Sequence, residues 1–103
     1  MEYKPISLEE LSIEISKGEN KMDEELLNFW NTIKITPSKW NENQFWNKEN
    51  SFWVVAKYKN LVLYYNDIED GFNISTFKKE GEIKEYCVEQ DELYFSVLKL
   101  SKF

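Results

Sequence analysis

Two stretches in the first third of the chain place apolar residues at helical spacing. Three apolar side chains of residues 7–17 fall on one helix face: Leu8, Leu11 and Ile15. Ser7 and Glu10 form a capping box at the start of this stretch, and Gly18 is suited to end it in a left-handed turn. The pattern therefore predicts an amphipathic first helix over residues 7–17.

A second helix is predicted over residues 23–33. Its first turn is acidic, which complements the helix dipole. The acidic residues are Asp23, Glu24 and Glu25, and the apolar stripe consists of Met22, Leu26, Phe29, Trp30 and Ile33. Pro37 then interrupts regular structure. The polar, Asn-rich residues 38–51 are expected to form a long connection.

From residue 52 the pattern changes to short runs rich in β-branched and aromatic residues, which favour strands. Four such runs cover residues 52–58, 61–65, 72–78 and 83–88. Lys59-Asn60 and Glu80-Gly81 stand where tight turns would join neighbouring strands, so an antiparallel meander is expected. The first two runs are apolar at nearly every position, which indicates a central sheet covered on both faces.

A last helix is predicted over residues 90–100, with Leu93, Val97 and Leu100 on one face. The order of elements predicts an α+β fold: two N-terminal helices, a four-stranded, mainly antiparallel sheet and a C-terminal helix. A length of 103 residues with 17% aromatic residues suits a single domain, residues 1–103, with a substantial core.

The cellular location is predicted from what the sequence lacks. No apolar run is long enough to cross a bilayer, and the first residues lack the basic and then apolar order of a signal peptide. A cytoplasmic protein is therefore expected. Cys87 is the only cysteine, so no internal disulfide can form. Its position in a β-rich run predicts a buried strand residue.

The charge balance narrows the possible chemistry. The formal net charge is −6, from 19 acidic residues against 13 lysines, and the chain has neither arginine nor histidine. Ser-His-Asp triads, Cys-His pairs and histidine-bearing zinc sites are thereby excluded. No catalytic residue, metal or cofactor is predicted. A negative surface repels nucleic acid and attracts a basic protein, although the same charge could serve only to keep a small domain soluble.

Residues 64–73 hold the densest cluster of polar side chains. An EF-hand calcium loop is excluded, because Ile68 would occupy the third ligand position. Three interpretations stay open: a structural turn, a surface that contacts a partner, and a catalytic or metal site. In the structural interpretation, Asn66 and Asp67 cap the loop backbone and Gly71 adopts a positive φ angle.

Four tryptophans are many for so short a chain. Trp30 and Trp53 lie on predicted regular elements, so they are expected in the core. Trp40 and Trp46 lie on the predicted connection, where they could be either core residues or aromatic contacts for a partner. The glutamates of the first helix form either a solvated face or a docking surface for a basic partner.

Three pieces of the chain carry a family resemblance: Trp53-Val54-Val55-Ala56, Tyr65-Asn66-Asp67-Ile68-Glu69-Asp70-Gly71-Phe72-Asn73 and Gln90-Asp91-Glu92-Leu93. Together they resemble small bacterial immunity proteins of polymorphic-toxin and contact-dependent growth inhibition systems, over about forty of the 103 residues. The resemblance implies a cytosolic protein without catalysis of its own. It would bind a cognate toxin domain, often a nuclease, and block its active site or substrate surface.

The leading hypothesis is therefore an immunity protein that uses its acidic loop, its first helix and the aromatic residues of the connection. Its predicted contact residues are Asp67, Glu69, Asp70, Trp46, Trp40, Glu10 and Glu14. The expected partner is a basic toxin domain, without direct contact to nucleic acid or membrane, and a monomer is favoured. Two alternatives stay open: a self-associating structural or regulatory module, and an enzyme that uses the carboxylates around Asp67.

Overall fold

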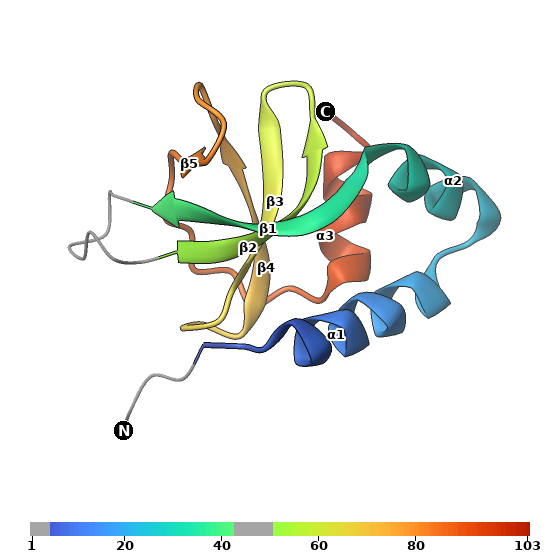
Figure 1. The fold of residues 1–103 in the computed structure, drawn as a ribbon. Helices are drawn as coiled ribbons and strands as arrows, with labels where there is room; N and C mark the ends of the chain where they lie inside the picture. Colours follow the sequence, from blue (N-terminus) through green and yellow to red (C-terminus); the bar gives the residue numbers. More distant parts are fainter. Residues whose placement is uncertain (1–4, 43–50) are drawn as a thin grey trace.

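The computed structural model describes residues 5–42 and 51–103. Within them the chain forms, in order, α1 (Leu8–Lys21), α2 (Glu24–Ile33), β1 (Lys34–Glu42), β2 (Ser51–Tyr58), β3 (Leu61–Asn66), β4 (Gly71–Thr76), β5 (Glu82–Ile83) and α3 (Leu93–Leu100) (Figure 1). The predicted α+β class, with N-terminal helices and a C-terminal helix, is confirmed. The sheet has five strands where the sequence predicts four. No helix of the described part is long and apolar enough to cross a membrane.

The five strands form one curled sheet in the order β4-β3-β2-β1-β5. Strands β2, β3 and β4 make the predicted antiparallel meander. Strand β1 adds to it antiparallel to β2, and the short β5 pairs parallel with the end of β1, where Glu42 lies opposite Ile83. The sheet is therefore mixed, and its final strand does not continue the meander.

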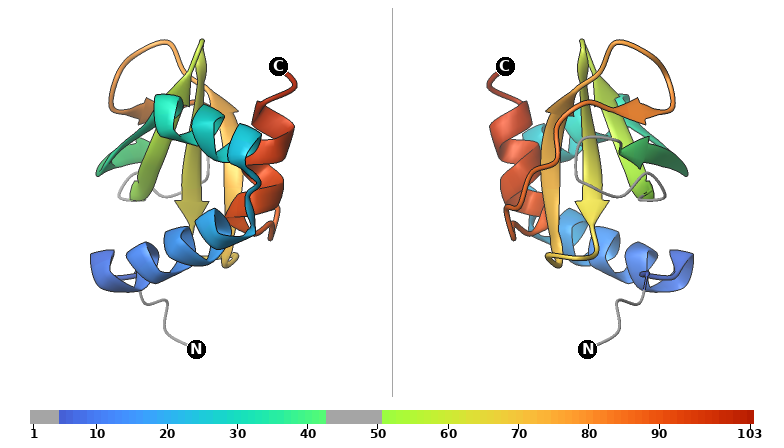
Figure 2. Two further views of the ribbon diagram at one scale, coloured as in Figure 1. Left: turned by 90° about the vertical axis from the view of Figure 1, so that its right-hand side faces the viewer. Right: turned by 90° about the vertical axis from the view of Figure 1, so that its left-hand side faces the viewer.

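Two hydrophobic cores lie on opposite faces of the sheet, because successive side chains of a strand point to opposite sides. The core on the helical side includes Leu11 of α1, Trp30 of α2, Leu63 and Tyr65 of β3, and Val97 of α3. Figure 2 shows α2 in front of the sheet from this side. The second core consists of Trp40, Phe52, Val54, Val62, Tyr64 and Ile83. Every residue of β3 is buried, which confirms a strand covered on both faces.

Residues 84–91, which we call the closing segment, run along the outer edge of β4 before α3 begins. Its two ends are held by backbone hydrogen bonds, from Lys84 N to Thr76 O at 3.3 Å and from Phe72 N to Asp91 O at 2.9 Å. The segment thereby covers an edge that would otherwise expose unpaired backbone groups.

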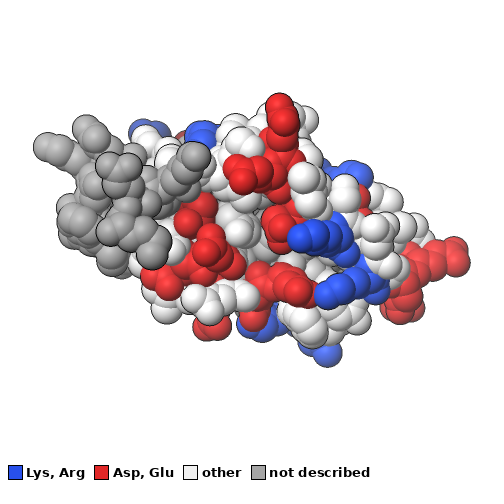
Figure 3. Space-filling view, turned by 90° about the horizontal axis from the view of Figure 1, so that it is seen from below, with Lys and Arg blue, Asp and Glu red and all other residues white. Residues whose placement is uncertain are grey.

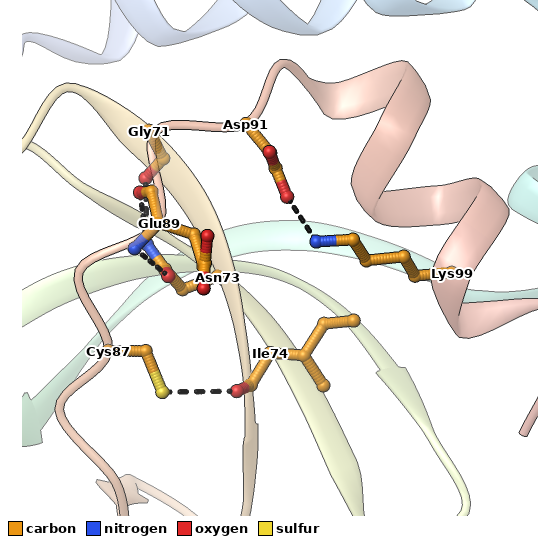
Figure 4. A network of polar contacts seen from close by, with 7 residues as sticks. All are labelled: Gly71, Asn73, Ile74, Cys87, Glu89, Asp91 and Lys99. Carbon is orange, nitrogen blue, oxygen red and sulfur yellow. Dashed lines mark hydrogen bonds and ion pairs between the residues drawn. The ribbon is translucent and has the colours of Figure 1, made fainter.

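Side chains make most of the intervening contacts of the closing segment (Figure 4). The Asn73 amide accepts a hydrogen bond from Glu89 N at 2.8 Å and donates one to Glu89 O at 3.0 Å. The Tyr64 hydroxyl donates to Glu85 O at 3.0 Å and accepts from Cys87 N at 2.8 Å. Burial raises the pKa of Tyr64 far above its ordinary value, so this hydroxyl stays protonated and keeps both bonds.

The prediction that residues 38–51 form a connection is wrong for its first part, because residues 34–42 form strand β1. The pairing register of β1 with β2 shifts between Lys34 and Ser38. Pro37 lies within this irregularity, where a missing N–H costs no ladder bond. A proline therefore did not mark the end of regular structure. Residues 43–50 lie outside the described part.

The prediction of a strand over residues 83–88 is also wrong, since β5 comprises only Glu82–Ile83. The closing segment that follows bonds to β4 largely through side chains, so its β-rich composition does not produce a ladder. Cys87 is accordingly half-buried and outside any strand, which corrects its assignment as a buried strand residue. Helix α3 begins at Leu93, later than predicted, because Asp91 still bridges to β4.

Gly18 does not end the first helix, which continues to Lys21. A Cβ atom built on Gly18 would lie 2.6 Å from Leu93 Cβ. The glycine thus allows α1 to approach α3 closely and is needed for packing between helices. The predicted capping box of Ser7 and Glu10 is confirmed, with both of its hydrogen bonds present.

Candidate binding site: an acidic hollow

The turn between β3 and β4, residues 67–70, lies beside the start of α1 (Figure 1). One Asp67 carboxylate oxygen accepts a hydrogen bond from Ile6 N at 2.8 Å, across 61 positions of sequence. The Ile6 carbonyl in turn accepts from Trp53 Nε1 at 3.3 Å. These two bonds attach the entry to α1 to the sheet and fix the helix relative to the turn.

The turn itself is held by Asn66. Its side-chain oxygen accepts hydrogen bonds from the backbone N–H groups of Ile68 at 3.0 Å and Glu69 at 3.3 Å, which confirms its predicted capping role. The residue with a positive φ is Asp70, at 57°, and the prediction of a positive φ at Gly71 is wrong.

Gly71 is required for another reason. A Cβ atom built there would lie 2.3 Å from Gln90 Cα, because the closing segment passes directly over the start of β4.

Four carboxylates converge around one open hollow of about 260 Å³. Its lining consists of Pro5, Ile6, Glu10, Glu14, Tyr65, Asp67 and Asp70. Glu10 and Glu14 stand one helical turn apart on α1 and therefore share a face, while both aspartates come from the turn. Figure 3 shows acidic side chains gathered across this face of the molecule. The structure thus brings together four of the seven predicted contact residues.

The pKa of Tyr65 reflects the negative charge around the hollow. Its side chain is 8% exposed, and its ring packs edge-on against Phe72, with 4.8 Å between ring centroids. Burial first, and then the negative charges that line the hollow, raise the pKa of Tyr65 to about 12. The contributing carboxylates are those of Asp70, Glu14, Asp67 and Glu10. The hollow therefore favours a positive charge near the tyrosine hydroxyl.

The other predicted contact residues lie elsewhere. Glu69 is half-buried on the turn but does not line the hollow. Trp40 is 4% exposed and packs against Phe77, with 5.3 Å between ring centroids, so it is a core residue and not an exposed contact. It is buried because β1 points it into the second core. Trp46 lies outside the described residues.

The remaining tryptophans were expected in the core. Trp30 is 1% exposed and donates from Nε1 to a Glu19 carboxylate oxygen at 2.7 Å. Trp53 is half-buried at the edge of the helical core. Sequence reasoning missed Tyr65 as a site residue, because a tyrosine inside an apolar strand is indistinguishable from an ordinary core aromatic.

The thiol of Cys87 is not reactive. Its sulfur lies 3.5 Å from the Ile74 carbonyl oxygen beside β4 (Figure 4). Burial raises the pKa of this thiol, against the lowering effect of the Tyr64 hydroxyl bond, and nearby glutamates raise it further. The thiol is therefore protonated at neutral pH and a poor nucleophile.

Within residues 5–42 and 51–103, no group of three or more histidine, cysteine or acidic side chains is arranged to hold a metal ion. No family model, curated protein or solved structure matches this chain. Function is therefore argued from the hollow and its charge.

Proposed function

We propose that this protein is a bacterial immunity protein that neutralises a basic toxin domain by binding it through the acidic hollow. The observation that carries the proposal is the convergence of four carboxylates, two from α1 and two from the turn, around one hollow. If α1 and the turn lay far apart, the glutamates of α1 would form an ordinary solvated helix face, and the aspartates would belong to an ordinary turn. Their convergence on a chain of net charge −6 suits a positively charged partner.

The mechanism of neutralisation would be occlusion. A nuclease binds the phosphate backbone through lysine and arginine side chains, and an acidic protein surface can engage the same groups. The charge of this chain would accelerate association, and desolvated contacts around the charged centre would slow dissociation. The chain would need no catalysis of its own and would act in the cytoplasm, where the toxin meets its substrate.

Self-association is the second candidate function. Large apolar side chains that are exposed in the described residues supply its only support: Leu8, Ile13, Ile68, Val88, Phe95 and Phe103. They are spread over α1, the turn, the closing segment, α3 and the end of the chain. Single apolar residues on a surface are common, and a homodimer interface is normally a continuous patch. An enzyme built on the carboxylates near Asp67 has less support, because the thiol is unreactive and the Asp67 carboxylate already holds the Ile6 backbone.

The test mixes the purified chain with the purified product of the gene immediately upstream, at low and at moderate salt. We expect a one-to-one complex, weakened by salt, in which the toxin loses its enzymatic activity. The double variant Glu14→Gln, Asp70→Asn should weaken the complex. A matched control, Glu24→Gln with Glu25→Gln, removes the same charge from exposed positions of α2 and should have little effect. A chain that binds no such product and sediments as an oligomer would favour self-association instead.

A further inference from the structure

We propose that the Glu85 carboxylate is a pH-sensitive latch, which holds the closing segment on the edge of β4 near neutral pH and releases it in acid. The latch belongs to the fold itself and does not depend on the proposed function.

The Glu85 side chain takes the place of a neighbouring strand at the end of β4. Its Oε1 atom accepts hydrogen bonds from Thr76 N at 2.8 Å, Thr76 Oγ1 at 2.9 Å and Ser75 Oγ at 3.3 Å. The Glu85 N–H donates in return to Ser75 Oγ at 2.8 Å. Backbone groups of alternate residues point to the same side of a strand, so Thr76 N–H faces the outer edge of β4, as Phe72 N–H does. One carboxylate oxygen therefore satisfies a group that would otherwise need another strand.

Charge distinguishes this contact from the rest of the closing segment. Asn73 holds Glu89 through a neutral amide. Tyr64 holds the backbone of the segment through a neutral hydroxyl. Among the hydrogen bonds that join residues 84–89 to the described part of the sheet, those of the Glu85 carboxylate carry a charge. Charge-assisted hydrogen bonds are roughly twice as strong as neutral ones, so protonation of Glu85 weakens the attachment of the segment at this point.

The same hydrogen bonds determine the direction of the pH dependence. The Thr76 backbone N–H lowers the pKa of Glu85 most, and partial burial opposes this effect. The hydroxyls of Thr76 and Ser75 and the positive charge of Lys84 lower the pKa further. The folded chain therefore binds this proton less readily than the unfolded chain. The contribution of the latch is complete above the ordinary glutamate pKa of about 4.3 and is lost as the pH falls through the lower pKa of the folded state.

Other titratable groups near the latch come from β3, β1 and the closing segment. Burial raises the pKa of Tyr64 and of Cys87, so both stay uncharged below neutral pH. Two more carboxylates, those of Glu42 on β1 and Glu89, lie close enough to act on Cys87. The hydroxyls that β4 presents to the latch do not titrate. A change at Glu85 itself is therefore needed to assign the effect of acid to this carboxylate.

Release of the latch would open the outer edge of β4. Unpaired backbone groups on such an edge are a template for pairing with another chain, and the closing segment prevents this. Helix α3 follows the segment and is anchored separately, because Leu93, Val97 and Leu100 lie in the core on the helical side. The opening should therefore stay local and leave the rest of the domain folded.

The test is amide hydrogen exchange of the whole chain, measured by NMR at about pH 6.5 and about pH 3, on either side of the ordinary glutamate pKa, and corrected for the intrinsic rate at each pH. Two amides are compared. Thr76 N–H bonds to the latch, and Leu63 is buried in the centre of the sheet and reports global unfolding. In acid, we expect the protection of Thr76 to fall about five- to tenfold more than that of Leu63.

Two variants assign the effect. Glu85→Gln keeps the length of the side chain and an acceptor oxygen but has no charge to lose. Its Thr76 amide should be about three- to tenfold less protected near neutral pH and should show no extra fall in acid relative to Leu63. The control Glu89→Gln removes the same charge from the same segment, where only the Glu89 backbone bonds to Asn73, and should behave like the unmutated chain.

The comparison of Thr76 with Leu63 in the unmutated chain requires no variant to fold. Equal losses of protection at the two amides would indicate global acid unfolding and overturn the latch, and so would the absence of any loss at Thr76. An extra loss at Thr76 that persists in Glu85→Gln would overturn the assignment to this carboxylate.

Discussion

The contact between Tyr64 and the closing segment gives the sharpest test of how this fold is held together. Tyr64→Phe keeps the buried ring and removes only the hydroxyl that joins β3 to the backbone of Glu85 and Cys87. One N–H donor and one carbonyl acceptor then lose their partner. Each buried group left without a hydrogen bond costs about 1–3 kcal/mol, and both residues are half-buried, so water can partly replace the hydroxyl. We expect a loss of about 2 kcal/mol in the free energy of unfolding.

The adjacent tyrosine is a matched control. Tyr65 points to the opposite face of the same strand, and within the described part of the chain its hydroxyl makes no hydrogen bond. Tyr65→Phe should therefore change the free energy of unfolding by less than about 0.5 kcal/mol.

The assay is urea unfolding followed by tryptophan fluorescence. With a slope of about 2 kcal/mol per molar urea, Tyr64→Phe should lower the midpoint by roughly 1 M. Equal midpoints for the two variants would refute the claim that the Tyr64 hydroxyl holds the closing segment in place.

Three further predictions concern stability. Because the pKa of Tyr65 is raised to about 12 from an ordinary value near 10, the unfolded chain loses this proton first, so the free energy of unfolding does not depend on this group below pH 10 and falls by about 2–3 kcal/mol as the pH rises to 12; urea midpoints across this range, compared with those of Tyr65→Phe, measure the fall. Gly71→Ala should cost more than about 2 kcal/mol, because the new methyl group overlaps the Gln90 backbone, and thermal unfolding would show a loss of roughly 8 °C or more; a shift under 2 °C would contradict the packing described. Ser7→Ala should cost about 1 kcal/mol by removing the side-chain cap of α1, and an unchanged urea midpoint would contradict the role of that cap.

The elements predicted correctly are those whose local pattern agrees with their final surroundings. Residues 23–33 have an acidic first turn and an apolar stripe, and α2 follows almost exactly the predicted bounds. Strand β3 is apolar on both sides, and both sides are covered. In these cases local propensity and tertiary burial favour the same structure, so these elements can be predicted from the sequence alone.

The elements predicted wrongly depend on contacts between distant segments. Strand β1 contains a proline and few apolar residues, and it is a strand because β2 pairs with it and Trp40 enters the second core. The closing segment has the composition of a strand, but Asn73 and the Tyr64 hydroxyl supply partners for its backbone in place of a ladder. No local pattern contains this information.

The candidate site was predictable in its parts and not as a whole. The acidic turn and the glutamates of the first helix were each visible in the sequence. Their convergence depends on the hydrogen bond between Asp67 and Ile6, across 61 positions, which no spacing rule specifies. The participation of Tyr65 follows only from its place in the lining of the hollow.

The central claim, that the acidic hollow binds a basic toxin domain, is tested most directly by the affinity for the upstream gene product as a function of salt. Raising the ionic strength from about 10 to about 100 mM shortens the Debye length from about 30 to about 10 Å, so electrostatic attraction should weaken and Kd should rise. We predict that Glu14→Gln with Asp70→Asn raises Kd at least about tenfold at low salt and flattens its salt dependence, whereas Glu24→Gln with Glu25→Gln does neither. Equal affinity and equal salt dependence for the two double variants would contradict the account.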